Sequence, residues 1–244
     1  MSQNIVKTWH KEIVKEFSRH STKKSNHVDL PKYLGTRNKL YSLTNATEKQ
    51  IAKDFLNRHK DITGAQFLDL VNALYAGDSF NERTFGTKLL AYKKKFKPLF
   101  TPARIYGWLG KLFGWCEVDS LCQSTFTADD LLAGWASWGK TLDKLSRDKS
   151  ISRRRASLVL LCKSVRGSSD IRLADMAFAN LDRLKGEKDL LISKAVSWLS
   201  RDLIRHHRAR VSDFISANRD ILPKFVVSEV QNKLTFGRKS LAKM

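Results

Sequence analysis

The sequence predicts an all-α protein, an α-solenoid or superhelix of stacked helix pairs with a basic concave face. Nearly every segment repeats its apolar residues at the helical period of about 3.6, and no segment alternates convincingly as a half-buried strand does. Helix pairs of about 35 to 45 residues follow one another along the chain, which is typical of α-solenoids. The 45 Lys and Arg against 24 Asp and Glu give a formal net charge of +21, which indicates a polyanionic partner, with nucleic acid ahead of a membrane surface.

Composition also limits the class of protein. We expect one helical-repeat domain over residues 1–244, with a disordered basic tail from about residue 236. No apolar run approaches the roughly 20 residues that span a bilayer, and the N-terminus lacks the apolar core of a secretory signal. The three cysteines are odd in number and lie in apolar stripes, which favours reduced thiols and no zinc site. We therefore expect a cytoplasmic monomer, nucleoid-associated in a prokaryote, with no membrane partner and no bound metal.

In the first half of the chain, apolar periodicity predicts helices at about 4–19, 48–59, 64–76, 82–95 and 102–113. Thr63 is expected to cap the third of these, and Asn81 or Ser79 the fourth. The basic run from Lys93 to Lys97 closes the fourth helix, where positive charge suits the negative end of the helix dipole. Residues 21–29 indicate a polar loop. The aperiodic segment 30–37 carries Tyr33 and is interpreted as a loop that approaches a ligand.

In the second half, the same pattern predicts a short helix around Trp115 and further helices at about 128–145, 150–165, 169–184, 187–206, 211–217 and 223–234. Trp135 and Trp138 are expected in the core. His206 and His207 are adjacent and face apart on a helix, so they are interpreted as surface residues and not as a metal pair.

The stretch from Gly114 to Cys122 places an aromatic ring and an acid together. As a helix, it puts Trp115 and Asp119 four residues apart on one face, while Val118 lies on the core side. A π face attracts a cation through its quadrupole and a carboxylate attracts it by full charge, so the pair predicts a site for something cationic. The alternative is a helix whose tryptophan is core and whose aspartate is solvated.

Three arginines, Arg153, Arg154 and Arg155, stand in the first turn of the helix at 150–165, where they oppose the positive end of the dipole. This arrangement costs stability unless an anion or a carboxylate offsets it. We interpret Arg153 and Arg154 as contacts to a phosphate backbone. Arg155 is in register with core residues and is expected to be partly buried and paired, with Asp119 as a candidate partner. The alternative is three solvated arginines.

A second basic stripe lies on the helix at 187–206. Away from the core residues of that helix, Lys194, Trp198, Arg201 and Arg205 recur at spacings of four, three and four. A tryptophan between cations suits a groove that follows a phosphate backbone and braces a sugar or base. A curved stack is expected to bring Trp115, Asp119, Arg155 and Trp198, from three different helices, onto one face.

Taken together, these motifs resemble the HEAT-like DNA alkylation repair family, the alkylpurine DNA glycosylases of the AlkD type. The resemblance covers most of the chain, and the order and separation of its motifs are more specific than any single one. The motifs on which it is based are Tyr33-Leu34-Gly35-Thr36-Arg37, Trp115-x-x-x-Asp119, Arg155-Ala156 and Lys194-Ala195-Val196-Ser197-Trp198-Leu199-x-Arg201. The chain departs from the family pattern at Cys116 and Glu117, where another aromatic and an acidic residue are frequent, which leaves the substrate range open.

The resemblance implies a monofunctional glycosylase of base-excision repair that releases cationic N3- or N7-alkylated purines from double-stranded DNA. Asp119 would be the catalytic carboxylate, with Trp115 and Trp198 as aromatic contacts to the damaged nucleotide. The expected DNA-binding residues are Arg155, Arg153, Arg154, Lys194, Arg201, Arg205 and Tyr33. A carboxylate near C1′ stabilises the positive charge that bond cleavage leaves on the sugar. Because alkylation has already activated the leaving base, neither a metal nor a nucleotide cofactor is required.

Two other functions stay open from the sequence. A catalytically silent relative would bind bent or branched DNA, but such a binder has no use for a carboxylate that faces phosphates. Asp119 together with both tryptophans therefore favours the enzyme. A helical-repeat scaffold for acidic proteins is the second alternative. The net charge favours DNA over protein, and it does not separate DNA from RNA.

Overall fold

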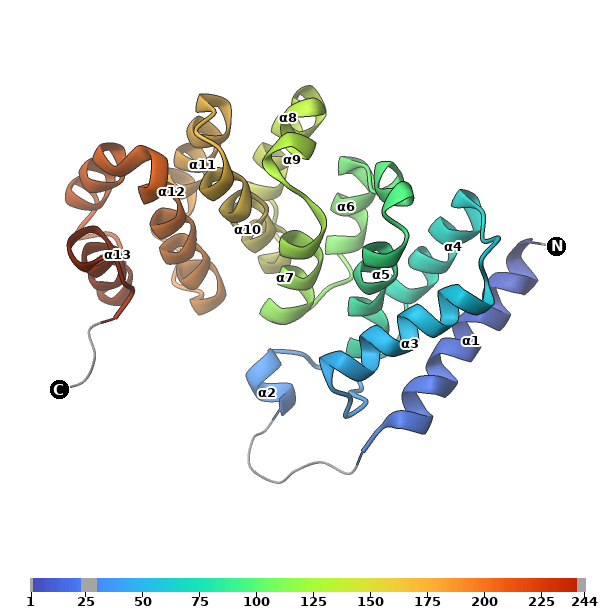
Figure 1. Ribbon diagram of the computed structural model, residues 1–244. Helices are drawn as coiled ribbons and strands as arrows, with labels where there is room; N and C mark the ends of the chain where they lie inside the picture. The colour runs from blue at the N-terminus through green and yellow to red at the C-terminus, as the bar shows by residue number, and fades with distance from the viewer. Residues whose placement is uncertain (1, 23–29, 241–244) are drawn as a thin grey trace. The chain divides into compact units, whose positions relative to one another are not determined.

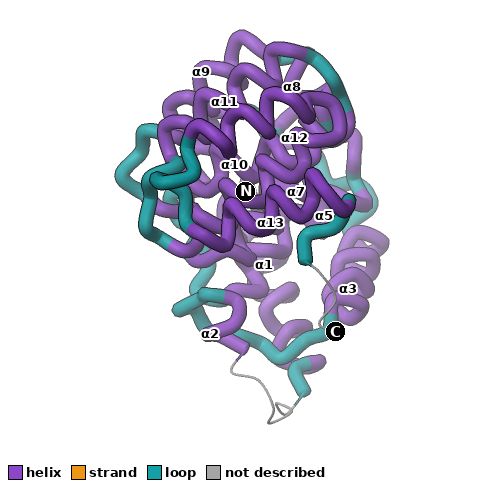
Figure 2. The backbone as a smooth tube through the Cα atoms, turned by 90° about the vertical axis from the view of Figure 1, so that its left-hand side faces the viewer, coloured by secondary structure: helices purple, strands orange, loops and turns teal. Residues whose placement is uncertain are grey.

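The computed structural model describes residues 2–22 and 30–240 as an all-α helical-repeat fold (Figure 1). Over those ranges it contains no β-strand, and a single isolated bridge pairs Lys39 with Ser79. Figure 2 shows helices joined by loops along the described trace. The predicted fold class is therefore confirmed. Most of the expected loop at 21–29 and the end of the expected basic tail, residues 241–244, lie outside the described residues.

The chain divides into two compact units, Met1–Thr125 and Phe126–Met244, and each is described by itself. The first unit contains α1 (Ser2–His20), α2 (Leu30–Leu34), α3 (Asn45–Arg58), α4 (Gly64–Tyr75), α5 (Phe80–Tyr92), the 3-10 helix η1 (Lys94–Leu99), α6 (Pro102–Leu109) and α7 (Gly114–Thr125). The second contains α8 (Ala128–Ala133), α9 (Trp135–Ser146), α10 (Ile151–Gly167), α11 (Ile171–Leu184), α12 (Leu190–Ala217) and α13 (Lys224–Phe236).

Local sequence sets the starts of α4 and α5. Thr63 and Ser79 each accept a hydrogen bond from a backbone N–H three residues later, and the side chain at that position bonds back to the cap. Both are capping boxes, which satisfy two backbone donors that the helix itself leaves unpaired. Thr63 and Ser79 are therefore confirmed as N-caps. Asn81, the other candidate for α5, instead accepts a hydrogen bond from the backbone N–H of Tyr41.

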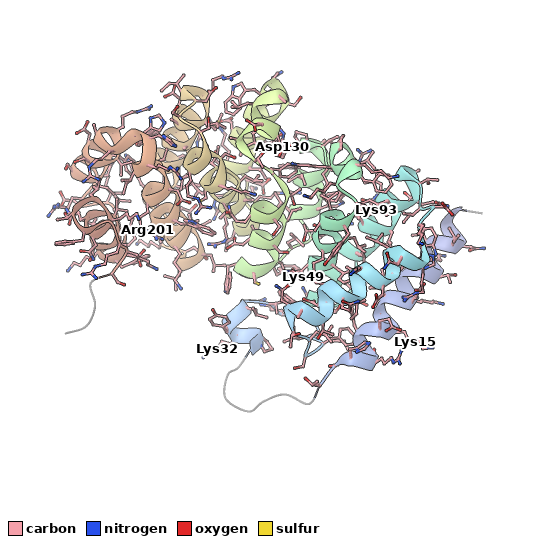
Figure 3. The ribbon with its side chains drawn as sticks, in the orientation of Figure 1. Lys15, Lys32, Lys49, Lys93, Asp130 and Arg201 are labelled. Atoms are coloured by element: carbon pink, nitrogen blue, oxygen red, sulfur yellow. The ribbon has the colours of Figure 1, made fainter. Side chains whose placement is uncertain are left out.

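Two predictions for the first unit are wrong. The segment expected to be an aperiodic loop contains α2, which is too short to show a helical period. Moreover, α5 ends at Tyr92, and the basic run that begins at Lys93 (Figure 3) continues into η1 and not into a last α-helical turn. Phe96 of η1 is buried against Phe67, with ring centroids 4.8 Å apart, so this basic segment also contributes a residue to the core.

The second unit differs from the sequence prediction at one helix boundary. The helix expected at 128–145 is interrupted at Gly134, where φ is −113° and ψ is 30°, so α8 and α9 are separate helices. The two helices expected at 187–206 and 211–217 both lie in α12, whose backbone is non-helical at His207, so the predicted break between them is confirmed as a kink. Trp138 is buried as predicted, whereas Trp135 is only half-buried.

In the first unit, α2 meets α7 at two glycines. Gly35 and Gly114 both have a φ of +68°, in the left-handed region that favours glycine. A Cβ placed on Gly114 would lie only 2.1 Å from the carbonyl oxygen of Gly35. Because the obstructing atom belongs to the backbone, no side-chain rotation relieves the overlap. The two glycines therefore permit the chain after α2 to rest directly on the first residue of α7.

We predict that Gly114→Ala lowers the free energy of unfolding by at least about 2 kcal/mol, since it adds both a strained φ and a backbone overlap. Gly107→Ala is the matched control, because Gly107 lies inside α6 and a Cβ there meets no atom within 4 Å. The control should be neutral or stabilising by up to about 1 kcal/mol. Urea denaturation of both variants tests this, and equal effects would contradict the close approach.

Candidate functional site

The first unit places the predicted aromatic and acidic pair on α7. Trp115 and Asp119 are one turn apart and both are half-buried, while Val118 and Leu121 on the other side of the helix are fully buried. The predicted division of α7 into a core face and a partly exposed face is therefore confirmed. Trp115 is not a core residue, so the alternative interpretation of this tryptophan is wrong.

Trp115 is held by the segment that follows α2. Its indole Nε1–H donates a hydrogen bond of 2.7 Å to the carbonyl oxygen of Tyr33. The two rings also meet edge to face, with centroids 5.7 Å apart and an interplanar angle of 88°, which is a favoured aromatic geometry. Tyr33 itself is 62% exposed. The structure therefore brings two predicted site residues together across 82 positions of sequence, and it uses the indole N–H to do so.

A third residue of α7, Glu117, contributes to this arrangement and was not among the predicted site residues. Its side chain is fully buried. Oε1 accepts hydrogen bonds from Thr36 Oγ1 at 2.7 Å and from Asn38 Nδ2 at 2.8 Å, and Oε2 accepts one from the Phe113 backbone N–H at 2.9 Å. The available signal in the sequence was an acid in register with core residues of a basic chain. Its partners were not readable because they lie far away along the chain.

Cys116 lies between Trp115 and Glu117 in the sequence, and the pKa of its thiol depends on the nearby charge of Asp119. The pKa of the Cys116 thiol is raised to about 11, mainly by burial and secondly by the negative charge of Asp119, while the ammonium of Lys88 opposes the shift. Lys88 itself forms an ion pair with Glu48, with Nζ and Oε2 3.1 Å apart. The surroundings of Cys116 therefore disfavour an additional negative charge, although the protein as a whole is strongly basic.

In the second unit, carboxylates offset the arginines that begin α10. Arg153 Nη1 lies 3.2 Å from Asp148 Oδ2, and Arg154 Nε lies 2.7 Å from Glu187 Oε1. Arg154 also donates to two backbone carbonyl oxygens in the turn that precedes the helix. The sequence predicted that an anion or a carboxylate offsets the charge at this helix start, and in the structure the carboxylates are those of Asp148 and Glu187. Both arginines are half-buried, so the alternative of three solvated arginines is wrong.

Arg155 is buried, with 4% of its surface exposed, as the sequence predicted. Its Nη1 donates a hydrogen bond to the carbonyl oxygen of Leu191, which ties the start of α10 to the start of α12. This contact lies within the second unit. Asp119 belongs to the first unit, so the pairing of Arg155 with Asp119 stays a prediction.

The predicted basic stripe lies on α12. Lys194 and Arg205 are exposed, and neither forms an ion pair with another described residue. Arg201, labelled in Figure 3, is half-buried. Its Nε donates to the Ser197 carbonyl oxygen at 3.1 Å, and its Nη2 lies 3.8 Å from Glu229 Oε2. Lys194 and Arg205 are therefore the two members of the stripe that present unpaired charge within the described chain.

Trp198 is half-buried and is held inside its own unit. Its side chain lies near Asp202, one turn later on α12, and acts to lower the pKa of that carboxyl. Burial raises the pKa of Asp202, while Arg166, with Nη1 3.6 Å from Asp202 Oδ1, acts in the opposite direction. Trp198 is therefore placed beside Asp202 within its own unit and keeps part of its surface exposed.

The fold and these sites define a strongly basic, all-α helical-repeat protein. The family model described as DNA alkylation repair enzyme matches residues 13–234. The chain therefore belongs to the DNA alkylation repair enzyme family, which confirms the resemblance and assigns the protein to DNA repair. The comparison with curated proteins finds no match. None of the described helices is long and apolar enough to cross a membrane, and no group of three or more potential metal ligands is found among the described residues.

We predict that Cys116 is an unreactive thiol at neutral pH. With a pKa of about 11, its thiolate fraction at pH 7.5 is on the order of 10² times smaller than that of an ordinary cysteine with a pKa near 8.5. Alkylation by iodoacetamide, followed by mass spectrometry of the Cys116 peptide, should be correspondingly slow and should accelerate as the pH rises toward 11. The urea-unfolded protein provides the control. Equal rates for native and unfolded protein would contradict the raised pKa.

Proposed function

We propose that the protein is a monofunctional DNA glycosylase that hydrolyses the N-glycosidic bond of cationic N3- or N7-alkylated purines in double-stranded DNA. The observation that carries this proposal is the pairing of Trp115 with Asp119 on the partly exposed face of α7. Family membership supports a DNA repair enzyme. The proposal goes beyond family membership in naming the reaction, glycosidic bond hydrolysis, and the lesion, a cationic alkylated purine.

The proposed chemistry needs one carboxylate and one water. As the bond from C1′ to the purine breaks, the cationic base takes the bonding electrons and leaves as a neutral alkylpurine. Positive charge then develops on the sugar, and the carboxylate of Asp119 stabilises it. Water adds to C1′ and loses a proton, which leaves an abasic site. The charge on the base makes it a good leaving group, so the base itself needs no protonation.

The aromatic residues support recognition of a cation. Because Trp115 donates its indole N–H to the Tyr33 carbonyl oxygen, it interacts with a ligand through its ring, and the half-buried Trp198 offers a second ring. A ring face attracts a cationic nucleotide without requiring a particular pattern of hydrogen bonds. Exposed Lys194 and Arg205 provide contacts to phosphates, which supply affinity without reading sequence.

We predict that Asp119→Asn lowers the single-turnover rate of 3- or 7-methylpurine release by about 10² or more. This is the size typical of losing one well-placed electrostatic contact in a transition state. Affinity for the damaged duplex should be unchanged or slightly improved, because the variant removes a negative charge beside phosphates. Methylated duplex DNA, with released bases quantified by chromatography and affinity by fluorescence anisotropy, gives both quantities on one preparation.

Asp69→Asn, an exposed aspartate of α4 in the same unit, is the matched control and should change neither quantity. Full activity of Asp119→Asn at unchanged melting temperature would exclude Asp119 as the catalytic carboxylate. If the unsubstituted protein binds damaged or bent DNA but releases no base, it is a catalytically silent DNA binder.

We also predict that affinity falls steeply with salt, and that Lys194→Ala makes the slope of log K against log salt shallower by about one unit. This is the change expected when one phosphate contact is lost. Lys140→Ala removes the same charge from an exposed position on α9 and should leave the slope nearly unchanged. If both variants change the slope equally, or if affinity is independent of salt, the stripe on α12 is not the phosphate contact.

A further inference from the structure

We propose that Glu117 is a positioning residue of the glycosylase site, holding Tyr33 and Trp115 in the arrangement that accompanies Asp119. The inference rests on the proposed function. Glu117 touches neither substrate nor reacting atoms in this proposal. It acts through the segment that it binds, and the evidence is the set of contacts around its buried carboxylate.

The two acids of α7 have opposite surroundings. Glu117 and Asp119 are two residues apart, which places them about 200° apart around the helix axis. Glu117 points into the interior and is fully buried, whereas Asp119 is half-buried on the same side as Trp115. A buried carboxylate costs several kcal/mol unless hydrogen bonds compensate it. Its presence in this interior position is explained by the donors that surround it.

The donors come from both segments that Glu117 joins. Oε1 is shared by Thr36 and Asn38, and Thr36 Oγ1 in turn accepts a hydrogen bond from the Asn38 backbone N–H at 3.2 Å. Oε2 binds the Phe113 N–H just before α7, where the first turn of a helix favours negative charge. One carboxylate therefore fixes the loop after α2 and the start of α7 to each other.

This connection determines where the aromatic pair lies. Gly35 precedes Thr36 and rests on Gly114, and Trp115 comes directly after Gly114. Across the same junction, the Trp115 indole donates to the Tyr33 carbonyl oxygen. The bonds to Glu117 are the charged and buried part of this junction, and the bond between Trp115 and Tyr33 is its exposed part. Neutralising Glu117 should therefore loosen Tyr33 and Trp115 first.

The test is Glu117→Gln in the full-length protein. A glutamine has the same shape, but its NH₂ group must face either the Thr36 and Asn38 donors or the Phe113 N–H, so one set of bonds is lost. We expect the single-turnover rate of base release to fall by about tenfold or more, since small displacements of positioning groups have effects of up to 10². The salt dependence of DNA binding should be unchanged, because no phosphate contact is removed.

A double-mutant cycle separates positioning from general stability. If Glu117 acts through Trp115, the rate effects of Glu117→Gln and Trp115→Phe should be less than additive. Glu48→Gln is the matched control. Glu48 is another buried acid of the first unit, bound by Asn81 and Lys88, so this variant should lower the melting temperature without a comparable fall in rate.

Additive rate effects in the cycle, or a rate unchanged by Glu117→Gln, would overturn the inference. If Glu117→Gln does not fold, Thr36→Val removes one donor and keeps the carboxylate. Thr36→Val should then give a smaller fall in rate, and its effect should again be less than additive with that of Trp115→Phe. Additive effects of these two variants would also overturn the inference. The proposed function fails separately, since it fails only if the unsubstituted protein releases no alkylated base.

Discussion

The structure depends on carboxylates that join one helix to another through buried hydrogen bonds and ion pairs. Glu48 of α3 binds Asn81 and Lys88 of α5, and Glu229 of α13 binds Ser197 of α12. A buried charge is tolerated only when such partners surround it. The chain has 24 Asp and Glu against 45 Lys and Arg. Acids that are engaged between helices do not neutralise the Lys and Arg at the surface, so positive charge is in excess there. The same composition thus provides polar ties inside the helical stack and the positive charge that favours a DNA partner.

The helix α7 carries two acids that differ in their exposure to solvent. Glu117 saturates its oxygens with three donors in the interior, while Asp119 lies on the partly exposed side of the same helix. The raised pKa of Cys116, caused first by burial and then by Asp119, indicates that the surrounding cations do not cancel this negative charge locally. Under the proposed function, a cationic base beside α7 would meet this carboxylate at short range, where its attraction outweighs the distant and screened excess of positive charge.

The features that the sequence predicted are those encoded within a few residues. Capping residues such as Thr63 and Ser79, and the faces of α7, follow from spacings of three and four positions. The short helix α2 and the interruption at Gly134 were missed, because packing against other elements decides whether such segments remain helical. Glu117 shows the same limit for the site. Its partners Thr36 and Asn38 lie 81 and 79 positions away, and no local pattern indicates such a contact.

The way in which Trp115 is held bears on how a lesion would be distinguished. Trp115 satisfies its indole N–H inside its own unit through the Tyr33 carbonyl oxygen, so its ring offers no donor to a base. A site that reads bases by hydrogen bonds rejects analogues that lack the matching group, whereas a ring face and a carboxylate respond to positive charge. Under the proposed function, selectivity for alkylated purines would therefore depend on the charge of the damaged base and the charge that develops on its sugar. The identity of the purine and the hydrogen-bonding groups on its edge would contribute little to this selectivity.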